Sequence, residues 1–197
     1  MKDKRLFEED LSYENRRKAF YDGFYEQNGI KVISRTDWDT DDGQEKQKED
    51  IDVYLKIGGT TFSVSEKDRN KNYGDILVEL FHIFDDGTRE NGWIEDTEAD
   101  LLSYFTPGTH FFANMQSLKE VVLEIIVPAL HSQIIGFEHE SLRFKRVYAN
   151  IGGKSRTMSL TSAHNSRKNR TWDTFSICIP VSDLKDYGVT IDKTEIE

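Results

Sequence analysis

Charged side chains stand inside an otherwise apolar stretch, residues 51–80, at spacings that would bring them together in a sheet. Asp52 lies in a first run of alternating apolar and polar residues, the pair Glu66-Lys67 closes a second run, and Glu79 lies in a third. Sheets normally carry Val, Ile, Thr or aromatic residues at such places. A divalent cation is the usual reason for clustered carboxylates, and Mg²⁺ binds one or two of them while keeping waters. The pattern therefore favours metal-assisted chemistry, with the lysine holding the attacking water or stabilising phosphate charge.

Three strands joined by tight turns are expected to position these groups. Gly58-Gly59 suits a hairpin turn, because glycine adopts positive φ at little cost. A polar turn over residues 68–74 separates the second strand from the third. The strict period of two predicts half-buried strands over residues 51–55, 62–67 and 76–80.

The rest of the chain predicts helices and further strands around this centre. A first helix spans residues 7–27, and Ser117 begins a second over residues 117–133, which Pro128 kinks or ends early. Residues 36–50 and 163–170 are polar and read as exposed loops. Residues 81–84 extend the third of these strands, and the other strands are expected at 30–35, 99–105, 109–115, 144–151, 156–162 and 174–181.

This order of elements resembles the PD-(D/E)-x-K nuclease superfamily, which has the restriction-endonuclease-like fold. In that pattern an aspartate opens the second strand, and Asp52 takes its place. A D/E-x-K triad occupies the third strand, and Lys67 takes the place of its lysine. The segments SEKDRNKNYGDILVEL and GWIEDTEADLLSYF also look like phage-type proteins of this superfamily. The resemblance covers residues 50 to 105 and implies Mg²⁺ or Mn²⁺ as cofactor and DNA as substrate.

One departure from the pattern leaves the metal ligands open. Position 65, two before Lys67, holds serine where the family has Asp or Glu. Residues i and i+2 share a strand face, so Glu66 would point away from Lys67. A local bulge could swing Glu66 onto the face of Lys67. Alternatively, Glu79 could supply the carboxylate, or the site could be inactive in a fold that serves binding.

A basic segment supplies a second, independent indication. Residues 141–172 contain eight Lys and Arg and no Asp or Glu, so the rest of this chain of net charge −10 carries −18. Lys and Arg supply phosphate contacts, and an aromatic residue such as Trp172 can stack on bases. The alternative is that the basic face pairs with the acidic remainder of the chain or with a second subunit. The predicted nucleic-acid contacts are Arg156, His164, Arg167, Lys168 and Arg170.

Length and composition bound the class of protein. The 197 residues predict one domain, with a core over about residues 7–135, a basic antiparallel elaboration over about 140–182, and a peripheral acidic tail over 183–197. Cys178 is the one cysteine of the chain, which excludes a disulfide framework and fits a reducing cytoplasm. It lies in an apolar run and is expected to be a buried thiol. No apolar run approaches 18 residues, so we expect no membrane span. Serine-hydrolase and zinc motifs are missing from the sequence.

These observations predict an α/β domain of restriction-endonuclease-like type, with a mixed central sheet flanked by helices and extra antiparallel C-terminal strands. Its expected function is Mg²⁺-dependent hydrolysis of DNA phosphodiesters. Asp52, Glu79 and, under the bulge alternative, Glu66 hold the metal, and Lys67 positions the water. A homodimer is compatible with this function. The alternative is a catalytically inactive nuclease fold, or an acidic phage-type inhibitor that binds a host protein.

Overall fold

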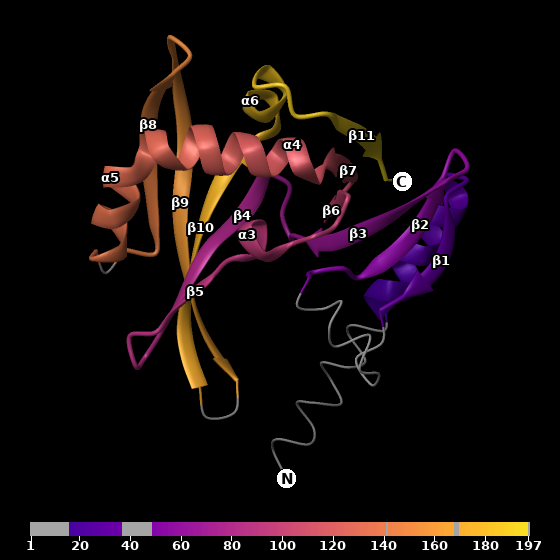
Figure 1. Ribbon diagram of the computed structural model, residues 1–197, viewed down its shortest axis with the longest axis horizontal. Coiled ribbons are helices and arrows are strands. Elements are labelled where there is room, and N and C mark those ends of the chain that lie inside the picture. Colours follow the sequence, from indigo (N-terminus) through magenta and orange to yellow (C-terminus); the bar gives the residue numbers. More distant parts are fainter. Residues whose placement is uncertain (1–15, 37–48, 141, 168–169, 197) are drawn as a thin grey trace.

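Two β-sheets and one long helix make up most of the molecule (Figure 1). The computed structural model describes residues 16–36, 49–140, 142–167 and 170–196. Sheet A has the order β1-β2-β3-β6-β7-β11, and sheet B the order β5-β4-β10-β9-β8. The strands of sheet A are β1 (Lys31–Arg35), β2 (Val53–Ile57), β3 (Thr60–Asp68), β6 (Leu101–Thr106), β7 (Thr109–Asn114) and β11 (Ile191–Glu195). Those of sheet B are β4 (Asp75–Phe84), β5 (Arg89–Asn91), β8 (Phe144–Ile151), β9 (Lys154–Arg167) and β10 (Arg170–Pro180).

Sheet A is mixed, because β3 runs parallel to β6, whereas every other pair of neighbouring strands in the sheet is antiparallel. The hairpin β2–β3 turns at Gly58 and Gly59, both with positive φ. Residues 16–27 form a helix whose apolar side packs on this sheet. Residues 7–15 of the predicted first helix lie outside the described residues. The packing joins buried side chains of the helix to those of three strands: Tyr21, Phe24, Tyr25, Val53, Leu55, Val64 and Phe105.

The mixed α/β class predicted from the sequence is confirmed, but the third strand of the central stretch has different neighbours. We expected β4 beside β3, whereas β4 pairs with β5 and β10 in sheet B. Periodicity predicts that a segment is a strand without specifying its partner. The strand beside β3 on the side away from β2 is β6. It follows a crossover that contains β4, β5 and the short helix α3 (Trp93–Asp96).

One continuous helix covers a face of sheet B. It comprises α4 (Met115–Glu120), the π-helical segment η1 (Val121–Ile126) and α5 (Val127–Glu138). Asn114, and not Ser117, caps it, since the Asn114 side chain accepts a hydrogen bond from the Ser117 amide at 2.9 Å. The prediction that Pro128 ends the helix early is wrong. Proline has no N–H to donate, and the wider turns of η1 immediately before it accommodate that loss.

The C-terminal third is more regular than the sequence indicated. The basic residues 163–170, predicted as a loop, mostly extend the hairpin of β9 and β10. The tail is not peripheral, because α6 (Val181–Asp186) buries Leu184 and β11 adds an edge strand to sheet A through β7. The strand period over Ile191–Glu195 is too short to stand out among charged residues.

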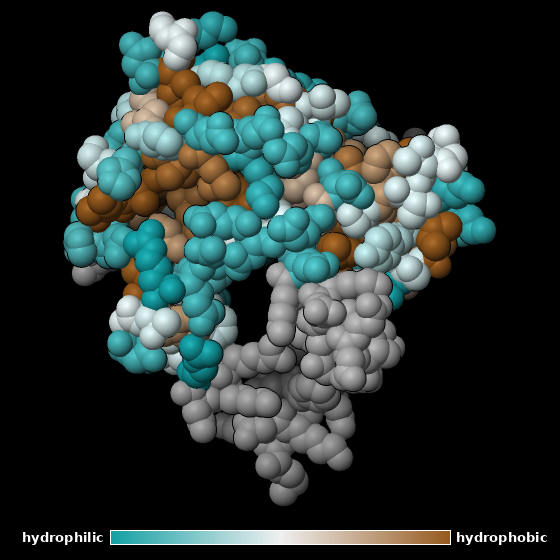
Figure 2. Space-filling model, in the orientation of Figure 1, coloured by the Kyte–Doolittle hydropathy of each residue, from teal (hydrophilic) through white to brown (hydrophobic). Residues whose placement is uncertain are grey.

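The long helix is also the one described segment that is apolar enough to cross a membrane. Met115–Glu138 has 24 residues and a mean hydropathy of 1.5 in its most apolar window, a third of which is buried. The core helix of a soluble protein meets the same criterion, and this helix packs on sheet B through Leu118, Val122, Ile126 and Leu130. Figure 2 shows apolar surface on the side of the molecule where α5 and β8 lie. The exposed large apolar or aromatic side chains of these two elements are Ile135, Phe144 and Tyr148.

Candidate active site

A lysine surrounded by carboxylates lies where β2 begins and β3 ends. The Lys67 ammonium contacts Asp50 Oδ1 at 2.5 Å, and the Ser65 hydroxyl donates to Asp50 Oδ2 at 2.6 Å. Ser65 and Lys67 share a face of β3 because they are two residues apart. One carboxylate therefore bridges the two side chains that the strand presents on this face.

Asp50 has an unusual backbone conformation. Its φ of 54° makes it the one non-glycine residue with positive φ in the described part of the chain. Aspartate adopts this left-handed region more readily than most residues, but at a cost of about 1–2 kcal/mol. The contacts to Lys67 and Ser65 hold its carboxylate in place. Asp50 was not among the predicted site residues, because the polar stretch 36–50 reads as an exposed loop; its position two before Asp52 was the available signal.

Asp52 lies beside this pair with a largely desolvated carboxylate. Its Oδ2 accepts a hydrogen bond from the Glu66 amide at 2.7 Å. Burial raises the pKa of Asp52 to about 6, with Lys67 opposing the shift and Asp50 adding to it. The carboxylate is therefore mostly ionised at neutral pH, but in a setting that disfavours its charge.

Lys67 and Glu79 complete the cluster. Burial acts to lower the pKa of Lys67, but the charges of Asp50, Asp52 and Glu79 outweigh it and raise that pKa. Lys67 is thus an ammonium at neutral pH and does not act as a base. Its Nζ also lies 5.8 Å from the centre of the Trp93 ring. Burial raises the pKa of Glu79, and the charge of Asp50 adds to the shift, whereas His82 and Lys67 oppose it. Glu79 thus interacts with the cluster although it lies on sheet B.

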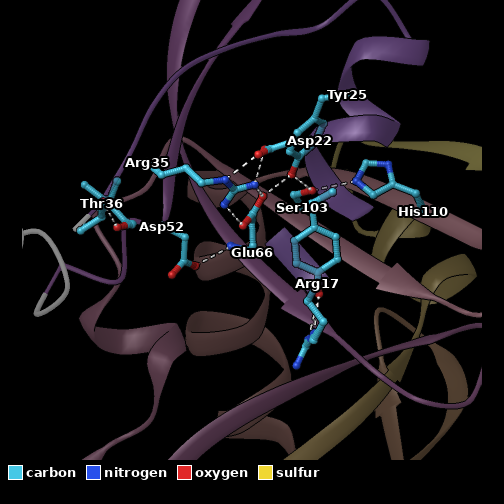
Figure 3. Close-up of polar contacts among 11 residues, drawn as sticks. Arg17, Asp22, Tyr25, Arg35, Thr36, Asp52, Glu66, Ser103 and His110 are labelled. Atoms are coloured by element: carbon cyan, nitrogen blue, oxygen red, sulfur yellow. Dashed lines mark hydrogen bonds and ion pairs between the residues drawn. The ribbon is translucent and has the colours of Figure 1, made fainter. Parts of the chain in front are cut away.

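Glu66 points to the opposite side of β3 (Figure 3). Its carboxylate binds Arg35 at 2.7 and 3.2 Å and accepts a hydrogen bond from the Tyr25 hydroxyl at 2.8 Å. The register of β3 with β6 runs without a shift through residues 64–68, so no bulge turns Glu66 toward Lys67. The structure therefore brings Asp52 and Glu79 to the region of Lys67, but it does not bring the carboxylate of Glu66 there.

On the side of β3 where the Glu66 carboxylate lies, a serine of β6 and a histidine of β7 are within hydrogen-bonding distance of each other. Ser103 Oγ lies 2.8 Å from His110 Nε2 and 2.8 Å from the Tyr25 hydroxyl. Both Ser103 and His110 are completely buried, and burial lowers the pKa of His110 to about 3. A substrate has no access to this pair, so its role is to join the N-terminal helix to sheet A.

The predicted DNA contacts are only partly available. The guanidinium of Arg156 pairs with Asp183 and Asp186, each at 2.7 Å, and so stabilises α6 against β9. His164 hydrogen-bonds Asp173 at 3.0 Å, and Arg170, although well exposed, forms an ion pair with Glu90 at 3.6 Å and lies over the Phe84 ring. The side chain of Arg167 and all of Lys168 lie outside the described residues.

The predicted ligands Asp52, Glu66 and Glu79 do not assemble into a metal site. Among the described residues, no three His, Cys, Asp or Glu side chains converge closely enough to hold an ion. Asp50 and Asp52 are nevertheless close enough for the charge of one to raise the pKa of the other. Two carboxylates and several waters are a donor set that Mg²⁺ accepts, so these two residues fit such an ion.

Comparison of the whole chain with protein-family models, with curated proteins and with solved structures gives no significant match, so the assignment of function depends on this geometry alone.

Proposed function

We propose that this protein is a metal-dependent nuclease that hydrolyses DNA phosphodiester bonds, with Asp50, Asp52 and Lys67 at its centre. The observation that carries the proposal is the position of the Asp50 carboxylate. It lies 2.6 Å beyond the Ser65 hydroxyl and 2.5 Å from the Lys67 ammonium. The PD-(D/E)-x-K pattern requires a carboxylate extending from position 65. Asp50 supplies a carboxylate in that place from a neighbouring segment. This is a fourth possibility beside the three expected from the sequence, which are a bulge that turns Glu66, a carboxylate from Glu79, and an inactive site.

The topology of sheet A supports the same proposal. The strands β1, β2 and β3 form an antiparallel meander after a helix, and β6 joins β3 in parallel. Asp52 directly precedes β2, and Lys67 lies near the end of β3. These are the places that the restriction-endonuclease-like pattern gives to its aspartate and its lysine.

The chemistry assigns different roles to the charged groups. Mg²⁺ held by Asp50 and Asp52 would polarise a phosphate oxygen and make a bound water more acidic. Lys67, which stays protonated, is suited to hold the attacking water or to stabilise charge that develops on the phosphate. Asp52 must be ionised to bind a cation, so activity is expected to fall below about pH 6, the value to which burial raises its pKa.

Cleavage of plasmid DNA with Mg²⁺ or Mn²⁺ tests the proposal. Lys67→Ala and Asp50→Ala should each lower the nicking rate at least about 100-fold. The first removes the cation that stabilises charge on the phosphate, and the second removes a carboxylate that would hold the metal. The double variant Asp50→Ala/Ser65→Asp should recover part of the activity, since it returns the carboxylate to position 65. Asp192→Ala, a change at an exposed position of the edge strand β11, is the matched control and should cleave like the wild type.

Two outcomes would overturn the proposal. One is equal nicking by the wild type and by Lys67→Ala, which would indicate a contaminating nuclease. The other is no cleavage by the wild type of supercoiled, linear or single-stranded DNA with either metal.

The alternative is a nuclease fold that only binds a partner. Two observations favour it: Asp50 uses both carboxylate oxygens within the protein, and Arg156 is occupied by two aspartates. An acidic inhibitor of net charge −10 should not bind DNA at all, whereas a nuclease should bind it with a steep salt dependence. A gel-shift titration in EDTA at increasing salt separates the two functions.

A further inference from the structure

A cavity of about 300 Å³ opens on the face of sheet B that the long helix leaves uncovered. Residues Phe175, Ile177 and Ile179 of β10 point to the helix side and are buried in the core. Their neighbours Trp172, Thr174 and Ser176 therefore point the other way, because side chains alternate along a strand. The cavity is lined by Leu77, Glu79, His82, Thr161, Ala163, Asn165, Trp172, Thr174 and Ser176.

The strand register arranges these side chains in rows across three strands. His82, Thr174 and Ala163 are cross-strand partners, as are Glu79, Ser176 and Thr161. The third row consists of Phe84, Trp172 and Asn165. The cavity is therefore a built feature of the sheet surface, with an aromatic end at Trp172 and an acidic end at Glu79.

A bulge in β4 makes this arrangement possible. The register shifts between Phe175 and Ser176, so that Phe81 and Glu79 are successive partners and Leu80 is the extra residue. Without the bulge, Glu79 and His82 would point to opposite faces, since they are three residues apart. Gly92 packs against the same place, where an added Cβ would come within 2.2 Å of the Glu79 carbonyl oxygen. The local sequence thus aims a carboxylate and an imidazole into one cavity.

Several polar groups of the cavity are already used within the protein. The Asn165 amide nitrogen is used, since it donates to Thr174 Oγ1 at 2.9 Å and to the Ala163 carbonyl at 3.1 Å. His82 Nδ1 also lies 2.9 Å from Thr174 Oγ1. This leaves the Asn165 carbonyl oxygen and the Glu79 carboxylate to receive hydrogen bonds from a ligand. The described lining contains no Lys or Arg, so the cavity itself is unsuited to a phosphate.

Groups suited to phosphate flank the cavity on both sides. At the Trp172 end, the Phe84 ring lies 5.8 Å from the indole, and the exposed Arg170 guanidinium lies 4.1 Å from the Phe84 ring centre. At the other end, Glu79 is within electrostatic range of Lys67 and Asp50. A chain molecule with a flat, N–H-bearing group between two anionic groups matches this sequence of features.

We infer that the cavity binds an unpaired nucleobase of a single-stranded nucleic acid, stacked on Trp172, with its amino group toward Glu79 and Asn165. The base is then next to the backbone phosphate that Lys67 faces. The inference deepens the proposed nuclease function and implies a preference for single-stranded substrate. A volume of about 300 Å³ is at the lower limit for small-ligand pockets and suits one base better than a duplex.

Binding of fluorescent 12-residue oligonucleotides, followed by anisotropy in EDTA, tests this inference without turnover. Trp172→Ala should weaken binding of oligo(dA) by roughly 5- to 100-fold, the range for loss of one base–aromatic stack. Trp172→Phe should retain most of the affinity and guards against misfolding of the alanine variant. Asp192→Ala, a change at an exposed position of β11 in sheet A, should bind like the wild type.

Base identity supplies a second arm. Oligo(dA) and oligo(dC), whose bases carry amino groups, should bind more tightly than oligo(dT), and oligo(rA) in parallel tells RNA from DNA as the natural strand. Equal affinity of the wild type and Trp172→Ala, equal affinity for all bases, or no binding of any strand would overturn the inference. Because EDTA prevents cleavage, failure here is distinct from failure of the nuclease: a wild type that nicks plasmid with Mg²⁺ while Trp172→Ala binds normally would retain the first proposal and remove the second.

Discussion

The ionisable group with the most unfavourable surroundings in the candidate site is Asp52. Its carboxylate is partly buried and close to Asp50, and the attraction of Lys67 compensates only part of the cost. Active sites often maintain such groups at the expense of stability, because the same charge is needed to bind a cation.

Asp52→Asn should reveal this cost as a pH-dependent gain in stability. The folded-state pKa, about 6, is above the unfolded value of 3.8, so the folded protein holds this proton more tightly. The corresponding stability is fully present below about pH 4 and is lost as the pH rises through 6, a difference of about 3 kcal/mol at most. Asparagine does not titrate, so the variant should be more stable than the wild type at pH 8 and similar to it at pH 4. Urea unfolding at the two pH values measures the difference.

Added Mg²⁺ gives the matching control for metal binding. It should raise the melting temperature of the wild type at pH 8 and leave Asp52→Asn unchanged, because only the carboxylate attracts the ion. A pH-independent difference between the two proteins would contradict the assignment of the raised pKa to this residue.

At the scale of elements, β3 carries two separate polar systems on its two faces. Lys67 and Ser65 face Asp50, whereas Glu66 faces Arg35 and Tyr25 and ties the N-terminal helix to the sheet. The Glu66 side chain is only 6% exposed, so its charge depends on Arg35 for compensation. Burial and the charge of Glu66 also raise the pKa of Tyr25, which therefore remains a neutral hydrogen-bond donor.

Glu66→Gln should lower the free energy of unfolding by about 3 kcal/mol, because Arg35 then loses the more buried of its two carboxylate partners and keeps only the more exposed Asp22. Glu26→Gln, a change at an exposed position of the N-terminal helix, should shift the free energy of unfolding by less than about 0.5 kcal/mol. Chemical denaturation of both variants provides the comparison. A larger loss from Glu26→Gln than from Glu66→Gln would disprove a structural role for the pair.

The elements themselves were largely predictable, and their partners were not. Alternation located β2, β3 and the first half of β4, because apolar and polar residues alternate there. The same period does not say that β4 leaves sheet A, since that depends on contacts with β10 about a hundred residues later. Asp52, Lys67 and Glu79 stood out as charges inside strands, whereas Asp50 was one of several acids in a polar segment and only its backbone conformation distinguishes it.

At the scale of the whole molecule, the C-terminal strand completes sheet A. Residues 183–197 looked peripheral because they are acidic, yet Ile191 is buried and β11 pairs with β7 over five residues. Composition is a weak guide for a short edge strand, because a single buried side chain can anchor it.

Ile191→Ala should therefore destabilise the protein by about 2–4 kcal/mol, the usual cost of removing a buried isoleucine side chain. Asp192→Ala, the exposed neighbour on the same strand, should change stability by less than about 0.5 kcal/mol. Differential scanning fluorimetry of both variants distinguishes the two. Identical melting temperatures would show that the tail contributes nothing to the fold.

The peptide N–H between the two faces of β3 has a consequence for how the protein could be switched off. Asp52 receives its hydrogen bond from the amide of Glu66, the residue whose side chain holds the N-terminal helix on the other side. Protease trimming of that helix would free the Glu66 side chain and loosen the strand that orients Asp52. The first twenty-odd described positions, although they contribute no group to the candidate site, would then decide whether that site is intact.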